Sequence, residues 1–363
     1  MGFTYNAQKE TCNTPETCWG LVFLRGMFFL LTRKGSPKKR AHFFSSWYNV
    51  DMLIDTHGHV NFAAFKNDAK EVLHRTLKGD TWVIMPGTQY ATSKKAVEMA
   101  EQYREGVYAA IGLHPIHLSE KRKVDVLEVQ SENTKEEEWM TFETQEEEFL
   151  YEKYKELGQS KKVAAVGECG LDYYYEPKSK ERREAQRRKQ KAALALQLKL
   201  ADELNLPIIF HCRKAHDDLI EFLTNYKLQT KNLRGVVHCY TGDLKQAEQF
   251  YNIGLSFGFN GLIFKDVPAL PNPKEIIGAL PLERIVLETD SPYLLPPLPA
   301  DPASVATSAK GAALAKAGQA GRNEPLFVKY VAEEIARIKG ILVDEVSSAT
   351  TKNAKALFRL NEI

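Results

Sequence analysis

The chain has 363 residues, of which 44% are hydrophobic and 26% charged, a composition typical of a globular protein with a large core. Lys and Arg total 49 against 47 Asp and Glu, a net charge of +2, so any attraction to a polyanion depends on local basic clusters. The cysteines number five and are irregularly spaced, which argues against a disulfide framework and favours a reducing, cytoplasmic location. The most hydrophobic stretch, residues 20–31, is interrupted by Arg25 and is too short to span a bilayer. We therefore expect no membrane partner.

Residues 1–51 precede any regular alternation of apolar and amphipathic segments. We interpret them as an N-terminal extension that is disordered or non-essential, and residues 52–363 as one domain. Because Met52 stands at the start of the first apolar run, a chain truncated to begin there is predicted to fold and to keep its activity. Loss of soluble protein on this deletion would contradict that interpretation.

From residue 52 onward, short apolar runs alternate with longer amphipathic segments. Runs that are apolar on both faces are typical of parallel strands covered by helices. Eight such units predict an α/β fold of the TIM type, a closed (β/α)8 barrel. The runs are residues 52–54, 82–85, 107–113, 163–166, 207–210, 235–237, 255–259 and 285–287.

Two segments interrupt this alternation and are predicted to be surface insertions. Residues 119–160 include the acidic triplets 136–138 and 146–148, and we expect a partly helical excursion there. Residues 296–319 are rich first in Pro and then in Ala, Ser, Gly and Lys, as in a flexible loop. We interpret both segments as solvent-exposed additions to the surface of the domain. The alternative is that one of the two segments shapes the access of substrate to the site.

Polar residues follow the strand runs at their carboxyl ends, which a parallel barrel gathers at one mouth. After the first run, period-two alternation places Asp55, His57 and His59 on one side of the strand. Glu168 follows the fourth run, and His211, His238 and Asp290 follow the fifth, sixth and eighth.

Four histidines and two carboxylates at one mouth indicate a metal site. A single histidine at a strand end is usually structural, but burying six ionisable groups together without a cation is costly. Six ligands exceed the needs of one tetrahedral ion, so two ions about 3.5 to 4 Å apart, bridged by a carboxylate, are the economical arrangement. Glu168 is the natural bridge. His42, His74 and His216 lie outside this pattern and are interpreted as structural.

The same residues resemble the TatD family of metal-dependent deoxyribonucleases. The resemblance rests on seven ordered motifs between residue 52 and the C-terminus, outside the two insertions. They are His57-Gly58-His59, Gly112-Leu113-His114-Pro115, Gly167-Glu168-Cys169-Gly170-Leu171-Asp172, His211 with Arg213, His238, Glu288-Thr289-Asp290-Ser291-Pro292 and Arg322-Asn323-Glu324-Pro325. The resemblance implies two divalent ions and hydrolysis of phosphodiesters in DNA, with exonuclease activity.

Carried over residue by residue, the resemblance assigns a role to each motif position. It implies that His57, His59, Glu168 and Asp290 hold one ion, and that Glu168, His211 and His238 hold the other. His114, Arg213 and Arg322 would contact the substrate, in agreement with the need for donors at a scissile phosphate. The N-terminal extension and the two insertions depart from the family in length and leave substrate preference open.

The ligand set predicts the mechanism and limits the metal. Metal coordination lowers the pKa of bound water towards neutrality, and we expect Asp290 to act as general base as well as ligand. Glu288 and Asp55 are more suited to orienting ligands. Mixed imidazole and carboxylate ligands favour Zn or Mn, and Mg remains a candidate. Cys169, Cys212 and Cys239 follow ligands directly, so alternation turns them away from the ions, and we interpret them as packing residues.

A basic cluster beside the Glu168 segment predicts the nucleic-acid partner. Tyr173, Tyr174 and Tyr175 precede it, and aromatic faces beside cations are how proteins bind single-stranded DNA. A solvated helix face is the alternative. The cluster consists of Lys178, Lys180, Arg182, Arg183, Arg187, Arg188, Lys189 and Lys191.

Three other functions remain open at this stage. The first is another dinuclear barrel hydrolase that acts on a carboxylic ester, an amide or a phosphotriester. The second is hydrolysis of D-aminoacyl-tRNA, an activity also attached to TatD-like proteins. The third is a non-catalytic module that binds metal or nucleic acid, which metal-restored turnover would exclude.

Overall fold

The computed structural model of the chain describes residues 20–24, 27–31, 52–119, 123–125, 141–144, 146–227, 230, 233–298 and 322–360. Contacts along the chain divide it into two compact units, residues 1–48 and 49–363. In the first unit, β1 (Gly20–Leu24) and β2 (Met27–Leu31) form an antiparallel pair with Gly20 opposite Leu31. The interpretation of residues 1–51 as a dispensable extension stays a prediction.

The second unit is built on one eight-stranded sheet whose neighbouring strands run parallel. All eight predicted runs are strands of this sheet, in the order β12-β11-β10-β9-β8-β5-β4-β3. The strands are β3 (Leu53–Asp55), β4 (Thr81–Pro86), β5 (Val107–Ile111), β8 (Val163–Asp172), β9 (Ile208–Arg213), β10 (Gly235–Val237), β11 (Ser256–Phe259) and β12 (Ile285–Leu287).

The first and last strands of the sheet come together and nearly close it into a barrel. The backbone N–H of Thr56 donates to Leu287 O at 2.9 Å, and that of Asp290 donates to His57 O at 2.8 Å. Gly58 and Ser291 form a further parallel bridge. The predicted (β/α)8 fold is confirmed. These bonds also bring the residues that follow β3 against those that follow β12.

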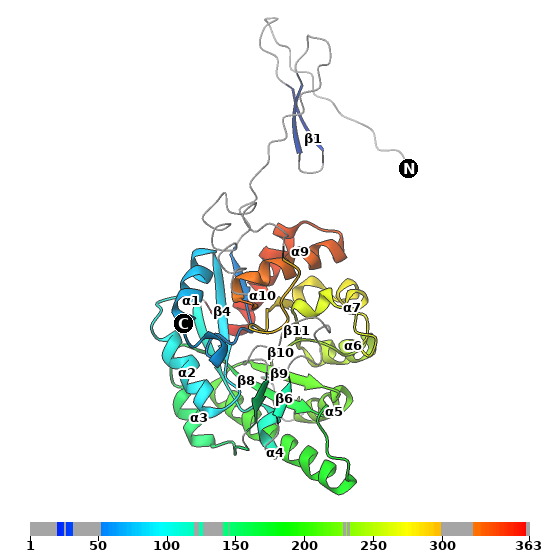
Figure 1. The fold of residues 1–363 in the computed structure, drawn as a ribbon. Helices are drawn as coiled ribbons and strands as arrows, with labels where there is room; N and C mark the ends of the chain where they lie inside the picture. The colour runs from blue at the N-terminus through cyan, green and yellow to red at the C-terminus, as the bar shows by residue number, and fades with distance from the viewer. Residues whose placement is uncertain are drawn as a thin grey trace, which may run out of the picture. The chain divides into compact units, whose positions relative to one another are not determined.

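Helices surround the strands, as Figure 1 shows for the second unit. The helices are α1 (Ala69–Lys78), α2 (Tyr90–Ala100), α3 (Tyr151–Leu157), α4 (Lys180–Leu204), α5 (His216–Lys227), α6 (Leu244–Ile253), α7 (Pro273–Ala279), α9 (Val328–Lys339) and α10 (Val343–Phe358). Short 3₁₀ helices include Ala63–Phe65, Pro115–Leu118, Gly261–Phe264, Leu282–Arg284 and Pro325–Phe327. No helix among the described residues is both long and apolar enough to cross a membrane.

Burial on both faces explains why the strand runs are continuously apolar. Every residue of β5 is buried, and so is every residue of β10 and β12. Fully burying a Val or Ile side chain stabilises the folded state by about 1.5 to 3 kcal/mol. A polar side chain is therefore costly within these strands, and polar residues gather at their carboxyl ends.

The two predicted insertions are described only in part. The first contains an antiparallel pair, β6 (Lys123–Asp125) with β7 (Thr141–Glu143), as well as the helix α3. Glu147 in this insertion accepts a hydrogen bond from the Tyr90 backbone N–H at 3.0 Å, at the start of α2. The first insertion is thus bonded to the barrel there. The acidic triplet 136–138 and nearly all of the segment 296–319 lie outside the described residues.

Candidate metal centre

The predicted ligands lie at the carboxyl ends of five strands and converge. His57 and His59 follow β3, and Glu168 and His211 lie in the second halves of β8 and β9. His238 directly follows β10, and Asp290 comes three residues after β12. The structure groups these residues into overlapping sets whose ligand atoms all lie within 4.8 Å of one another. The sets are His57 with Glu168 and His238, His57 with His59 and Asp290, and His114 with Glu168 and His211.

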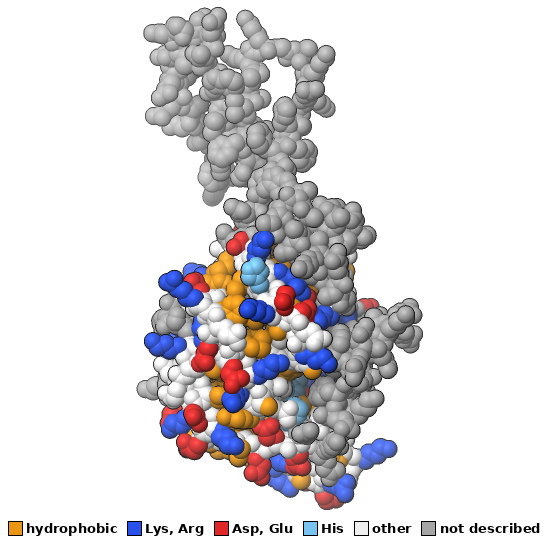
Figure 2. Space-filling model, turned by 60° about the vertical axis from the view of Figure 1, so that its left-hand side comes forward, with side chains coloured by type: hydrophobic (Ala, Val, Ile, Leu, Met, Phe, Trp, Pro, Cys, Tyr) orange, Lys and Arg blue, Asp and Glu red, His pale blue; other side chains and the backbone are white. Residues whose placement is uncertain are grey.

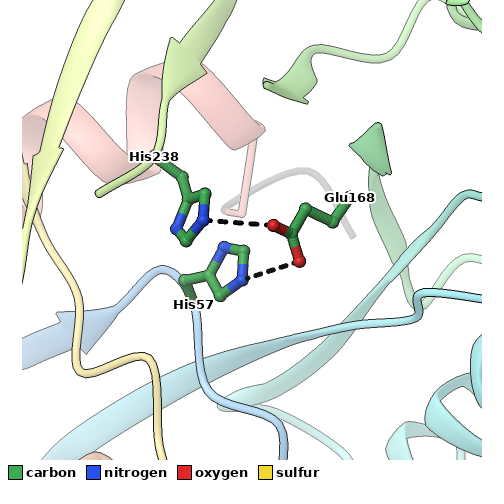
Figure 3. Close-up of side chains that lie close together, drawn as sticks. All are labelled: His57, Glu168 and His238. Carbon is green, nitrogen blue, oxygen red and sulfur yellow. Dashed lines mark ion pairs between the residues drawn. The ribbon is translucent and has the colours of Figure 1, made fainter. Parts of the chain in front are cut away.

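Glu168 is at the centre of the cluster. Its Oε2 lies 3.4 Å from His57 Nε2, and its Oε1 lies 3.1 Å from His238 Nε2. Figure 3 shows these two rings approaching opposite oxygens of the one carboxylate. The same Oε1 lies 2.9 Å from His211 Nδ1 and 3.4 Å from His114 Nε2. One carboxylate therefore faces imidazoles on both of its oxygens, as a bridging ligand must.

The backbone of β8 is irregular where it presents Glu168. The pairing of β8 with β9 shifts register between Val166 and Cys169, and such bulges re-aim side chains beside active sites. Gly170 has φ +151°, and a Cβ there would lie 2.0 Å from His211 O. Only glycine allows this approach. The sequence run predicted as a strand ended at residue 166, whereas the strand continues to Asp172, because polar residues and glycines conceal its second half.

Asp290 and the two histidines after β3 form the other side of the cluster. Asp290 Oδ1 lies 3.4 Å from His59 Nε2 and 3.9 Å from His57 Nε2. Asp290 has φ +56°, a conformation that is uncommon outside glycine and that gathers at functional sites. Its side chain is 17% exposed against 5% for Glu168, so it is the more open of the two carboxylates to water.

The outer nitrogens of three imidazoles face oxygen atoms. His59 Nδ1 lies 3.1 Å from the carbonyl oxygen of Pro86, and His211 Nε2 lies 3.0 Å from Asp172 Oδ2. His238 Nδ1 lies 3.4 Å from Glu288 Oε1. A neutral ring that donates from its outer nitrogen has a bare lone pair on its inner nitrogen. In that tautomer each of the three inner nitrogens can offer an electron pair to a cation.

His114 has the opposite tautomer. Its Nδ1 accepts a hydrogen bond from the Ile116 backbone N–H at 3.1 Å, so in the neutral ring the hydrogen is on Nε2. That nitrogen faces Glu168. Distance alone groups His114 with the possible ligands, but an N–H cannot bind a cation. His114 therefore has the chemistry of a hydrogen-bond donor aimed into the site, in keeping with its predicted contact with substrate.

This donor set fits divalent cations. His57 Nε2 and His59 Nε2 lie 3.1 Å apart, and imidazole nitrogens face carboxylate oxygens across the cluster. Lone pairs that face each other repel unless positive charge lies between them. Burial opposes charge on His238, yet Glu168 and Glu288 raise its pKa well above the usual value. Burial likewise favours neutral Glu168, but His114 and His238 hold its pKa well below the usual value. The cluster thus attracts positive charge, and imidazole with carboxylate is a ligand set for Zn or Mn.

Comparisons with known proteins agree with this geometry. The model of the family described as TatD related DNase matches residues 54–359. The chain belongs to the TatD family. "Uncharacterized metal-dependent hydrolase YabD" of Bacillus subtilis is 33% identical over 85% of the chain and 100% of that protein. "3'-5' ssDNA/RNA exonuclease TatD" of Erwinia amylovora is 30% identical over the same shares.

A solved structure supports the same assignment. The TatD homologue YJJV of Escherichia coli K12 is 29% identical, covers 85% of this chain and 98% of its own, and superposes with a TM-score of 0.61. A TatD-family hydrolase from Entamoeba histolytica shares the fold at 22% identity. The chain is thus a metal-dependent hydrolase of the TatD family with a TIM barrel fold.

Two buried carboxylates of this TatD protein, Asp55 and Glu288, contact residues of the cluster and help to fix their positions. Asp55 accepts hydrogen bonds from the backbone N–H groups of His57 at 3.1 Å and Thr289 at 2.8 Å, which joins the two halves of the metal centre. Burial raises the pKa of Asp55 to about 7 against the bonds from Thr289 and His57 that lower it. Glu288 accepts from Asn260 at 3.1 Å while it faces His238.

The two predicted substrate-binding arginines lie outside the ligand cluster. Arg213 ends β9, and its guanidinium stacks on the ring of Tyr174 at 3.6 Å. Arg322 pairs with Asp68 and donates to Ala64 O at 2.7 Å. Its position therefore supports a structural contact between the Arg322 segment and the chain after β3. Substrate contact by either arginine stays a prediction.

Some residues that shape the TatD centre were absent from the sequence prediction of the site. Asp172 is hydrogen-bonded to His211. Its position at the end of the Gly167-to-Asp172 motif is the sequence feature that could have indicated this role. Asn323 donates to Thr289 O at 2.9 Å and to Tyr293 O at 2.6 Å, so it holds both sides of the Asp290 turn. Cys169 and Cys212 are buried in the core, as expected of packing residues.

His216 provides a pH test that is separate from the metal centre. Its ring is buried at the start of α5, edge-on to Tyr240, and burial lowers its pKa to about 4 from 6.5. Below pH 6.5 the unfolded chain binds this proton first, so the free energy of unfolding falls as pH falls towards 4. At pH 5.0 the loss is about 2 kcal/mol. Denaturant unfolding at pH 7.5 and 5.0 is expected to show that loss in the wild type and not in His216→Phe, and equal losses in the two proteins would contradict it.

Proposed function

We propose that this TatD-family hydrolase cleaves phosphodiester bonds of DNA, that it removes nucleotides from an end, and that it prefers single strands. Two divalent ions would be held, one by His57, His59, Glu168 and Asp290, the other by Glu168, His211 and His238. His114 and Arg213 would bind the substrate. The relative from Erwinia amylovora, named as a 3'-5' ssDNA/RNA exonuclease, supports the end-directed mode.

The tautomer of His114 is the observation that carries this proposal. In the tautomers that leave their inner nitrogens bare, three imidazoles join two carboxylates in offering electron pairs, and His114 Nε2–H points in among them. A phosphodiester needs cations and a donor on its non-bridging oxygens while charge develops in the transition state. The site thus combines electron-pair donors for cations with a donor for a phosphate oxygen.

Each residue of the site has a separate role in the proposed reaction. Divalent ions in such a site polarise a phosphoryl oxygen and lower the pKa of water. His114 Nε2–H donates to a phosphate oxygen, and Asp290, the more open carboxylate, accepts the proton of the attacking water. Asp55, Glu288 and Asp172 keep the histidines in place.

The rim beside Glu168 suits a single strand. Arg213 and Lys214 both lie over the ring of Tyr174, at 3.6 Å and 4.5 Å, and Tyr175 meets that ring edge-on. An exposed base can stack on such a platform while the cations face the backbone phosphates. We propose a cytoplasmic location, where a nucleic-acid substrate would be accessible to this site.

The basic residues of α4 contribute less than the sequence suggested. Arg187 is bonded to Glu176, Lys191 pairs with Asp218 at 2.8 Å, and Lys189 pairs with Glu146. In Figure 2 basic and acidic side chains are interspersed on the face drawn, with no large field of one sign. A mostly solvated helix face explains these residues, and the platform on Tyr174 is the better candidate for strand contact.

The proposal is tested by cleavage assays on metal-stripped protein. Labelled single- and double-stranded DNA, RNA and D-aminoacyl-tRNA are incubated with added Mg, Mn or Zn. We expect metal-restored release of nucleotides from an end of single-stranded DNA. Hydrolysis of D-aminoacyl-tRNA with no cleavage of DNA would overturn the proposed substrate.

Replacing Tyr174 with Ala is expected to weaken single-strand binding by about 1 to 3 kcal/mol. The matched control is Tyr251→Ala, because Tyr251 is an exposed tyrosine of α6 that also pairs with an arginine, Arg284 at 5.4 Å. Affinity for a short labelled strand is measured across a salt series. Affinity should fall with salt for the wild type and the control, and equal affinities for the two variants would contradict a platform role.

A further inference from the structure

Two buried glutamines of α4 hold backbone groups beside the site. Gln190 accepts from the Asp172 N–H at 2.9 Å and donates to Asp172 O at 2.9 Å. Gln197 accepts from the Leu113 N–H at 2.8 Å and donates to Leu113 O at 3.1 Å. Each planar amide thus bonds both backbone groups of one residue, in the way that a neighbouring strand would. Each glutamine is only 1% exposed.

The residues held in this way adjoin two histidines with different chemistry. Asp172 Oδ2 lies 3.0 Å from His211 Nε2, which holds the ring with its Nδ1 towards Glu168, 2.9 Å from Oε1. Leu113 directly precedes His114, whose Nε2–H is the donor in the site. Gln190 therefore acts next to a metal-ligand histidine, and Gln197 next to a substrate-binding histidine.

The helix geometry allows one element to set both positions. The glutamines are seven residues apart, which is about two helical turns and about 10.5 Å along the same face of α4. That face meets the ends of β5 and β8, which are neighbours in the barrel. The two glutamines are the buried polar side chains of α4. The buried residues of this helix are Gln190, Ala193, Leu194, Gln197, Leu198, Leu200 and Ala201.

We propose that Gln190 and Gln197 are positioning residues: Gln190 orients His211 as a metal ligand through Asp172, and Gln197 orients His114 as the substrate donor. A buried amide is costly unless all of its groups are bonded, and each of these amides is bonded to the backbone of a residue at or beside one of the two histidines. The Gln197 half of this inference rests on the proposed function. The Gln190 half needs only a metal-binding site.

The test compares Gln190→Met with Gln197→Met, which serve as controls for each other. Both changes keep the length of the side chain and remove the same two bonds from the same helix. In Q190M we expect affinity for Mn or Zn, titrated without substrate, to fall about 10- to 100-fold, while Q197M binds metal as the wild type does. In Q197M we expect the KM for single-stranded DNA to rise about tenfold or more, with metal affinity retained.

A second measurement separates this role from general stabilisation and from the choice of substrate. Histidine-ring ¹H–¹⁵N NMR spectra of metal-free protein should show shifts at His211 in Q190M and at His114 in Q197M, with His59 unchanged in both. Ring signals that move alike in both variants, or metal affinities that fall equally, would overturn the inference. If Q190M does not fold, Gln190→Glu retains the acceptor for the Asp172 N–H and takes its place. A wild type inactive on DNA would refute the substrate, while the metal titration and the ring spectra would still decide the inference.

Discussion

Replacing Glu168 with Gln is expected to lower turnover at least about a hundredfold while leaving the barrel folded. Glu168 is the one carboxylate that faces His57, His114, His211 and His238. The amide has the same size but lacks the negative charge, and its NH₂ group presents hydrogens to imidazole nitrogens that should bind cations. Both proposed ions would lose their shared ligand.

The control for this variant is Glu248→Gln, the same change at an exposed position of α6. Turnover on single-stranded DNA and metal content by elemental analysis are measured together with circular dichroism. E248Q should match the wild type in all three. If E168Q kept full turnover and full metal content, the assignment of Glu168 as a bridging ligand would be wrong.

The barrel could be predicted from the sequence because its signal is local. Runs such as residues 285–287 are apolar at every position, and the corresponding strand is buried at every position. The residues of the cluster could be predicted to converge for the same reason, since a polar residue that directly follows a buried strand is conspicuous. The end of β8 was missed because its second half carries Glu168, Asp172 and two glycines that belong to the site and do not resemble a strand.

The features that could not be predicted from the sequence depend on how individual side chains are oriented in the fold. Gln190 and Gln197 stand in a highly charged helix, where a glutamine is usually solvated, and only packing reveals that both are buried. His114 and His238 look alike in sequence, yet Ile116 N–H donates to Nδ1 of His114, whereas Nδ1 of His238 faces a Glu288 oxygen. Arg322 belongs to a motif of the family, but its partners are Asp68 and Ala64. Such roles are decided by partners distant along the chain.

Removing the metal is expected to abolish turnover and to lower the melting temperature without unfolding the barrel at room temperature. The core of apolar strands does not depend on the ions, whereas the buried carboxylates of Glu168 and Asp290 would lose the positive charge that offsets their own without them. Binding of an ion at a thousand times its Kd would stabilise the folded state by about 4 kcal/mol. Activity, melting temperature and the number of ions per chain are measured before stripping and after Mn or Zn is added back.

Two matched variants connect this response to the tautomers. His238→Gln removes a bare nitrogen that faces Glu168, so it should lose most of the rise in melting temperature on adding metal. His114→Gln keeps an N–H donor at a similar reach and removes no electron pair from the cluster, so it should retain that rise and lose activity only in part. A stripped protein with full activity would refute the metal centre. If both variants lost the metal response equally, His114 would be a metal ligand. Its Nε2 would then have a free electron pair, which requires the other tautomer, because an N–H group does not bind a cation.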